Sequence, residues 1–143
     1  MECLLVSSCF AGYNTKYNGK NNKLEMIEKL STKYKLIYVC PEVVGGLSIP
    51  RNPSEILGDK VISNKGVDVT KEYNKGANCA LYLVKKYNIT KALLKESSPS
   101  CGSNTVYDGT FSGTKIKGMG VTASLLTKHG VKIYSENNIE ELL

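Results

Sequence analysis

Short apolar runs alternate along this chain with longer segments in which apolar residues recur at helical spacing. The short runs are rich in leucine and β-branched residues, and Gly12 soon follows the first of them, so the runs are predicted to be buried strands. Strands that alternate with helices favour a parallel sheet with right-handed crossovers and helices on both faces. We therefore expect an α/β fold, a small Rossmann-like three-layer sandwich with a mainly parallel sheet. The four expected strands span residues 3–8, 36–39, 92–95 and 131–134.

The longer segments have the amphipathic pattern of surface helices. The first helix is expected over residues 23–34, where Asn21 or Asn22 can cap its start. The second is expected over residues 70–87, with Thr70 as its cap. The remaining expected helices lie at residues 121–128, ending before Gly130, and in the tail at residues 136–143.

Two long stretches interrupt this alternation. Residues 40–59 contain three prolines and the Gly45–Gly46 pair, so we expect a long loop there. Residues 97–120 are rich in glycine and small polar residues, and they too are expected to be a loop rather than a core element. Loops of this length in a compact domain are usually functional or disordered.

Length and composition fit one globular domain. The chain has 143 residues, of which 41% are hydrophobic and 22% charged, so residues 1–143 are expected to form a single domain around one core. No apolar run approaches the roughly 20 residues of a membrane helix, and Glu2 opens the chain without a basic leader. We therefore expect no membrane segment and a cytoplasmic location. Five cysteines, an odd number, agree with a reducing compartment in which thiols serve metal binding or catalysis.

A net charge of +6 could attract phosphates or nucleic acid. The lysines, however, are scattered along the chain and form neither a stripe nor a pattern interleaved with aromatic residues. Nucleic-acid binding is therefore not expected as a main function.

Three cysteines are placed where ligands bind in parallel sheets, outside the carboxyl ends of the strands. Cys9 follows the first expected strand, Cys40 closes the second, and Cys101 lies a few residues past the third. We therefore expect these three thiols to meet at one edge of the sheet. Cys3 lies within a strand and Cys79 on a helix, and both are interpreted as small buried hydrophobes.

Three thiolates without a fourth partner suit either zinc or an iron–sulfur cluster with one uncoordinated iron. Structural zinc normally has four ligands in closely spaced pairs, but this chain has no CxxC pair, and its one histidine, His129, is expected at the opposite edge. A three-cysteine cluster would leave one iron open as a Lewis acid for a soft ligand such as sulfur.

Several other side chains are candidates for the same edge. Glu42, two residues after Cys40, could transfer protons there, or it could simply bind loop backbone. Ser97, Ser98 and Ser100, which precede Cys101, could orient a substrate or serve as turn residues. The glycine-rich residues 109–120 precede a helix, and we interpret them as a flexible wall of the site.

Three segments taken together resemble the thiouracil desulfurase (desulfidase) family: SSCFAGYNTKYNG, CPEVVGGLSIPR and ESSPSCGSNTVYDGTFSG. The resemblance runs from about residue 6 to residue 135. It implies a Rossmann-like fold and a four-iron four-sulfur (4Fe-4S) cluster held by Cys9, Cys40 and Cys101. It also implies that water replaces the sulfur of a small thiolated base such as 2-thiouracil, without net redox change. Glu42 and one of the two serines, Ser98 or Ser100, would assist.

A second hypothesis belongs to a different class of protein. The charge of +6 and the glycine-rich loop are also compatible with a non-catalytic module that binds a nucleotide or the thio-modified base of an RNA. Turnover distinguishes the two hypotheses, because only the enzyme releases sulfide.

Overall fold

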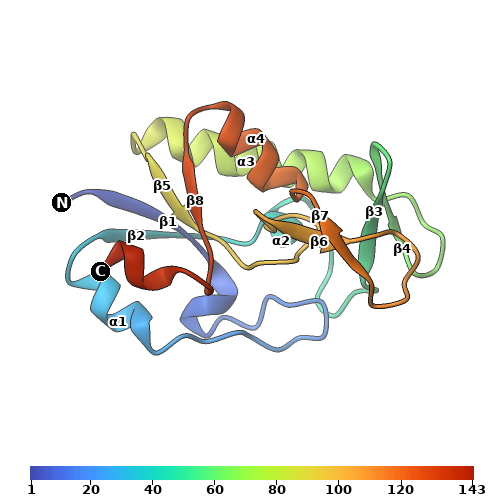
Figure 1. Ribbon diagram of the computed structural model, residues 1–143, viewed down its shortest axis with the longest axis horizontal. Helices are drawn as coiled ribbons and strands as arrows, with labels where there is room; N and C mark the ends of the chain where they lie inside the picture. The colour runs from blue at the N-terminus through green and yellow to red at the C-terminus, as the bar shows by residue number, and fades with distance from the viewer.

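A four-stranded parallel sheet forms the centre of the protein in a computed structural model that describes residues 1–143. The strand order is β2-β1-β5-β8, so β1 lies between β2 and β5 (Figure 1). Leu4 pairs with Leu36 on one side of β1, and Leu5 pairs with Ala92 on the other. The strands are β1 (Cys3–Ser7), β2 (Lys35–Val39), β5 (Lys91–Leu93) and β8 (Lys132–Tyr134). The predicted parallel sheet is confirmed, with strand ends that differ by one or two residues.

Helices cover both faces of this sheet, as Figure 1 shows. On one face lie α1 (Met26–Ser31) and the short 3-10 helix η2 (Ile139–Leu142), and on the other lie α3 (Thr70–Lys86) and α4 (Val121–Lys128). Side chains of β1 alternate between the two cores, because successive strand residues point to opposite faces. Leu4 and Val6 enter the core under α1, whereas Leu5 enters the core under α3 and α4. The predicted three-layer α/β sandwich is confirmed. None of its helices is long and apolar enough to cross a membrane.

Two predicted helix starts are wrong. Asn22 does not cap α1, because its backbone N–H donates to the Cys9 carbonyl and its side chain to the Cys9 sulfur. The helix begins four residues later, and no side chain caps it. Thr70 is the first residue of α3 rather than its cap, and its hydroxyl oxygen accepts the N–H of Val61.

Both predicted loops contain regular structure, so these predictions need correction. Residues 40–59 include the one-turn helix α2 (Pro41–Val44), because proline is well suited to the first position of a helix. They also include β3 (Ser54–Leu57), which pairs with β4 (Lys60–Ser63) across a two-residue turn at Gly58 and Asp59. Gly58 has a positive φ of 66°, as such tight hairpin turns require. A second hairpin in residues 97–120 joins β6 (Thr105–Tyr107) to β7 (Lys115–Lys117).

The backbones of α2 and α3 touch at two glycines. A Cβ atom on Gly76 of α3 would overlap the carbonyl of Pro41, and one on Gly45 would overlap the carbonyl of Glu72. Both positions therefore require glycine because of space rather than backbone angle. This contact matters for function, since α2 directly follows Cys40 and carries Glu42.

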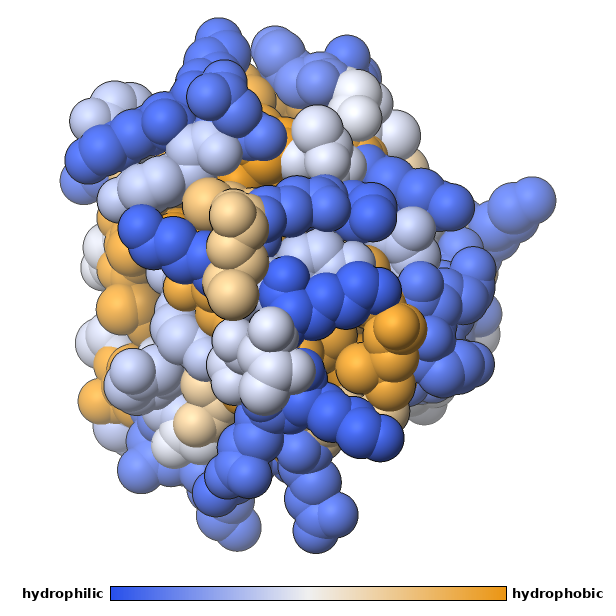
Figure 2. Space-filling model, turned by 90° about the vertical axis from the view of Figure 1, so that its left-hand side faces the viewer, coloured by the Kyte–Doolittle hydropathy of each residue, from blue (hydrophilic) through white to orange (hydrophobic).

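Lysines that are scattered in the sequence gather at the amino edge of the sheet, where α3 and α4 end. The amino groups of Lys33 and Lys91 lie 5.6 and 5.7 Å from the ring centre of Tyr34. Lys35 and Lys86 share the ring of Tyr87 in the same way. Figure 2, which faces the side where β1, β2 and β5 begin, shows a mostly hydrophilic surface. The premise that lysines and aromatic residues are not interleaved is therefore wrong for the folded chain, while nucleic-acid binding itself is untested.

The contact between α2 and α3 leads to a prediction for Gly76→Ala. At an exposed helix position this change stabilises a protein by about 1 kcal/mol. Here the added methyl meets backbone that cannot move aside, so we expect the free energy of unfolding to fall by about 1–3 kcal/mol or more. Urea unfolding measures the difference, with the exposed neighbour Lys75→Ala as the control. A Gly76→Ala protein as stable as the wild type would contradict the close packing.

Candidate functional site

A cavity of about 620 Å³ opens at the carboxyl ends of the central strands. It lies beside the point where the chain leaves β1 for β2 on one side and later for β5 on the other, the usual ligand position in open α/β sheets. Cys9, Cys40 and Cys101 all line this cavity, together with Glu42 and Ser98. Cys3 and Cys79 do not line it. The structure thus brings together the three thiols that the sequence placed at one edge.

Each of the three cysteines is presented directly by a strand end or by the loop after it. Cys9 sits in the 3-10 helix η1 (Ser8–Ala11), which follows β1 at once. Cys40 is the residue between β2 and α2, and it has extended backbone angles. Cys101 lies in the turn after β5, where its N–H donates to the Ser98 hydroxyl at 3.2 Å. Strand direction therefore sets the positions of all three.

Two of the thiols, Cys9 and Cys101, are buried, and the charge of Cys40 would act on both. Burial raises the pKa of the Cys9 thiol, the Asn22 side chain opposes this through a 3.5 Å contact, and Cys40 adds to the rise. Burial also raises the pKa of Cys101, and Cys40 again adds to the rise. The Cys40 thiol donates to the carbonyl of Thr15 at 3.7 Å. Cys9 and Cys101 are therefore neutral thiols at neutral pH unless a metal displaces their protons.

The donor set fits an iron–sulfur cluster better than a single metal ion. No group of three or more histidine, cysteine, aspartate or glutamate side chains is close enough to hold one ion. Three sulfur donors around one cavity suit a cluster, in which each thiolate binds a different iron. The Thr15 hydroxyl, a buried polar atom without a partner, also lines the cavity, so the lining retains an unused donor. His129 takes no part, since its ring bonds the Leu125 carbonyl at the end of α4.

Glu42 is held by three side chains from other parts of the chain. Its Oε1 accepts the Arg51 Nε–H at 3.1 Å and the Tyr73 hydroxyl at 2.8 Å. Its Oε2 has one contact, from the Ser98 hydroxyl at 3.4 Å. Burial raises the pKa of Tyr73, and the charge of Glu42 raises it further, so this phenol stays protonated and donates. The carboxylate is thus fixed in place, with one oxygen largely free on the side of Ser98.

Arg51 is a residue that the sequence reasoning missed, although it ends the segment CPEVVGGLSIPR. Its side chain is only 7% exposed, and besides Glu42 it donates to the carbonyls of Thr15 and Ser48. It therefore connects the loop after β1 to the helix that carries Glu42. Buried arginine is rarely found without such partners, because an unpaired buried charge is costly.

The two candidate serines differ in position. The Ser98 hydroxyl faces Glu42 and accepts the N–H groups of Ser100 and Cys101. Ser100 is fully buried, its hydroxyl bonds that of Thr122 at 2.9 Å, and it is not part of the cavity lining. The geometry therefore favours Ser98 over Ser100 as the serine that can reach a substrate.

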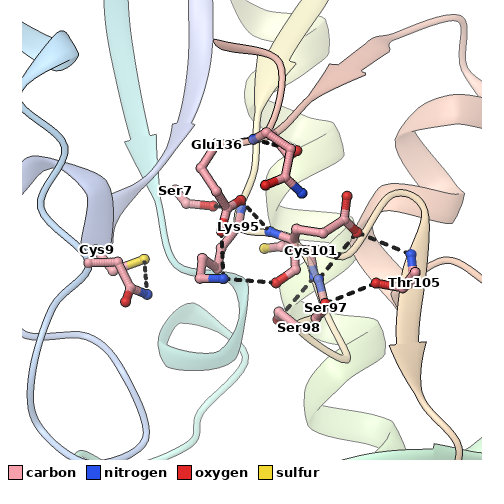
Figure 3. Close-up of polar contacts among 12 residues, drawn as sticks. Ser7, Cys9, Lys95, Ser97, Ser98, Cys101, Thr105 and Glu136 are labelled. Carbon is pink, nitrogen blue, oxygen red and sulfur yellow. Dashed lines mark hydrogen bonds and ion pairs between the residues drawn. The ribbon is translucent and has the colours of Figure 1, made fainter. Parts of the chain in front are cut away.

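Glu96 organises the loop that carries Cys101, and it too was missed from the sequence. Its Oε1 accepts the backbone N–H groups of Ser97, Ser103, Asn104 and Thr105 at 3.0 to 3.2 Å. Figure 3 shows this loop next to Cys101 and Ser98. Burial opposes the charge of Glu96, but the backbone amides of Asn104 and Thr105 outweigh it and lower its pKa to about 2. The loop is therefore wrapped around a carboxylate that is ionised at neutral pH.

The glycine-rich segment 109–120 forms part of the cavity wall through Phe111 and Lys115. Glu55 of β3 anchors the start of the segment, because its carboxylate accepts the N–H groups of Gly109 and Phe111. The predicted wall is present, and a β-hairpin carries it.

Comparison with known proteins gives three likenesses. The family described as 2-thiouracil desulfurase matches residues 4–138. The uncharacterized protein YbbK of Bacillus subtilis (strain 168) is 44% identical over 150 residues, which cover 98% of this chain and 99% of that protein. The solved structure of the [4Fe-4S]-dependent thiouracil desulfidase TudS superposes with a TM-score of 0.95 at 40% identity, over 99% of this chain and 95% of that one. The likeness extends over almost the whole length of each.

The role of Glu96 predicts a pH-dependent loss of stability. A carboxyl group whose pKa is lowered on folding stabilises the protein above its ordinary pKa of 4.5, and the stabilisation is lost as the pH falls towards about 2. Glu96→Gln should cost about 1–3 kcal/mol at neutral pH, and the difference from the wild type should shrink as the solution is acidified. Urea unfolding at a series of pH values measures this, with exposed Glu28→Gln as the control. A difference that does not change with pH would contradict the assignment.

Proposed function

The chain belongs to the 2-thiouracil desulfurase family, and we propose that it is a [4Fe-4S]-dependent thiouracil desulfidase, as the similar structure of TudS is described to be. The observation that carries the proposal is that Cys9, Cys40 and Cys101 line the same cavity. Glu42 and Ser98 line it as well. We expect the protein to act in the cytoplasm, where its five free cysteines stay reduced.

Cys9, Cys40 and Cys101 would hold the cluster, since they are the three cysteines of the cavity. Thiolate is the usual ligand of such clusters, and binding would release the protons that burial keeps on Cys9 and Cys101. Three protein ligands for four irons would leave one iron to act as a Lewis acid for the sulfur of the substrate.

The substrate would be a small thiolated base such as 2-thiouracil. A water oxygen would bond to the ring carbon and the carbon–sulfur bond would break, so that 2-thiouracil and water give uracil and hydrogen sulfide. Both protons of the water end on the sulfide, and no net oxidation or reduction occurs. The protein must therefore move protons from the attacking water towards the departing sulfur.

Glu42 is the group best placed to move these protons. Arg51 and Tyr73 engage its Oε1, so the less engaged Oε2 would accept the proton of the water. The Ser98 hydroxyl, 3.4 Å from this oxygen, would orient the water or the base. Because Ser98 is itself held by two backbone N–H groups, its hydroxyl has a fixed position from which to donate.

Cluster binding predicts which cysteine substitutions abolish activity. After anaerobic reconstitution, the wild type should bind about four irons per chain, absorb broadly in visible light and release sulfide from 2-thiouracil. Cys9→Ser, Cys40→Ser and Cys101→Ser should each lose iron and activity together. Cys3→Ser and Cys79→Ser, which lie outside the cavity, are matched controls that should keep both.

An iron-free wild type after careful reconstitution would overturn the proposal. Binding of a thiolated base without sulfide release, unaffected by Cys101→Ser, would instead favour a non-catalytic binding module.

Proton transfer by Glu42 predicts a selective loss of turnover. Glu42→Gln keeps an acceptor for Tyr73 but cannot take up a proton, so kcat should fall by roughly a hundredfold or more. The iron content and the visible spectrum should remain those of the wild type. Glu28→Gln, which alters an exposed carboxylate away from the cavity, is the control and should retain turnover. Full activity of Glu42→Gln would exclude it from proton transfer, and loss of iron would show that it supports the cluster instead.

A further inference from the structure

Lys95 lies at the same cavity as the three cysteines, two residues beyond the end of β5. Its backbone N–H donates to the Ser7 hydroxyl at 3.1 Å, which ties the end of β5 to the end of β1. In the view of Figure 3 its side chain extends between Cys9 and Cys101. Its charge also acts on Cys9, where it opposes the rise in the pKa of that thiol. Lys95 is therefore placed next to the cysteines that would hold the cluster.

The amino group of Lys95 is anchored but not fully used. It donates to Glu136 Oε2 at 2.6 Å and to the Glu96 carbonyl at 3.1 Å. The other oxygen of Glu136 accepts the backbone N–H of Glu96 at 2.8 Å, which fixes the carboxylate that holds the lysine. A lysine ammonium carries three N–H donors. Two have partners in the protein, so one remains for a ligand in the cavity.

The second anchored cation of the cavity is less available. The Arg51 side chain is 7% exposed and donates to Glu42 and to two backbone carbonyls. The Lys95 side chain is 33% exposed. Lys16 and Lys115 also line the cavity, but no carboxylate anchors either of them. Lys95 is thus the cation that combines a fixed position with a free donor.

An ammonium group donates hydrogen bonds and accepts none. It therefore favours a ring carbonyl oxygen, which accepts a hydrogen bond, at the position it faces. It disfavours an amino group there, because two N–H donors would point at each other without an acceptor. A polar group built to bond one substituent discriminates strongly against an analogue that cannot accept the bond. For pyrimidines this difference applies at C4, where uracil-type bases carry a carbonyl oxygen and cytosine-type bases carry an amino group.

We propose that Lys95 is a specificity-determining residue, whose free N–H donates to the ring carbonyl oxygen of the thiolated base. The site then accepts 2-thiouracil and rejects 2-thiocytosine. This inference rests on the proposed desulfidase function and adds to it the class of ring that the site takes. Glu136 acts through Lys95 and is a positioning residue.

The test compares the two bases in the reconstituted protein. Wild type should have the higher kcat/KM for 2-thiouracil, and Lys95→Met should lower that value by about 10- to 100-fold, mainly through KM, while affecting 2-thiocytosine much less. Lys95→Arg, which keeps a donor, should recover part of the preference. The control is Lys91→Met, at the start of β5 and at the opposite edge of the sheet, whose lysine also pairs with a glutamate. Iron content and melting temperature should match the wild type in every variant compared.

Calorimetric binding of uracil and cytosine to the same proteins separates this inference from the proposed function, because it needs no turnover. Uracil should bind wild type more tightly than cytosine, and Lys95→Met should remove the difference even if no sulfide is ever released. A Lys95→Met protein that keeps the wild-type preference between the bases would overturn the role of Lys95. So would an equal loss for both bases, which would indicate only a structural role for the lysine.

Discussion

The parallel pairing of β1 with β2 on one side and β5 on the other is the constraint on which the site depends. Parallel strands end at the same edge, so the residues that follow them meet there whatever their separation in the chain. Cys9, Cys40 and Cys101 are brought to one cavity by this rule. Alternation along β1 supplies a core on each face of the sheet, so the strand that leads to Cys9 also joins the two layers of helices to the sheet. The parallel pairing of these strands therefore determines both the fold and the position of the candidate site.

Two carboxylates, those of Glu42 and Glu96, hold the loops of the cavity in place through hydrogen bonds. Glu42 accepts hydrogen bonds from Arg51, Tyr73 and Ser98, and so joins α2 to α3 and to the loop after β5. Arg51 extends this link to Thr15 in the loop after β1. Glu96 accepts hydrogen bonds from four backbone N–H groups and so shapes the loop that carries Cys101. Charged hydrogen bonds are stronger than neutral ones and orient both partners, so each carboxylate holds a segment that has little apolar surface of its own. Hydrogen bonds to charged groups therefore hold the loops of the cavity in place, whereas burial of apolar side chains holds the sheet together.

Two cationic side chains of the cavity, Arg51 and Lys95, differ in how many of their donors the protein uses. Arg51 is nearly buried and engaged by acceptors of the protein, as a structural charge must be. Lys95 is anchored on one side by Glu136 and remains a donor on the other. Carboxylate and ammonium groups around the three thiols give the cavity both proton acceptors and donors, which replacement of sulfur by oxygen requires. Arg51 and Lys95 each pair with a carboxylate, which limits the cost of burying these charges.

The sequence by itself determined the parallel sheet, its main helices and the three cysteines of the cavity, because these follow from local periodicity and from the position of a residue relative to its strand. It also indicated Glu42, through its distance of two residues from Cys40. Only the tertiary structure placed Ser98 in the cavity lining and Ser100 outside it, showed α2 and the two hairpins inside the expected loops, and identified Arg51, Glu96 and Lys95. Their partners lie up to 88 residues away in sequence, as between Lys95 and Ser7. A local pattern reports which face of a helix or strand is buried, but it carries no record of which distant group will satisfy a buried charge.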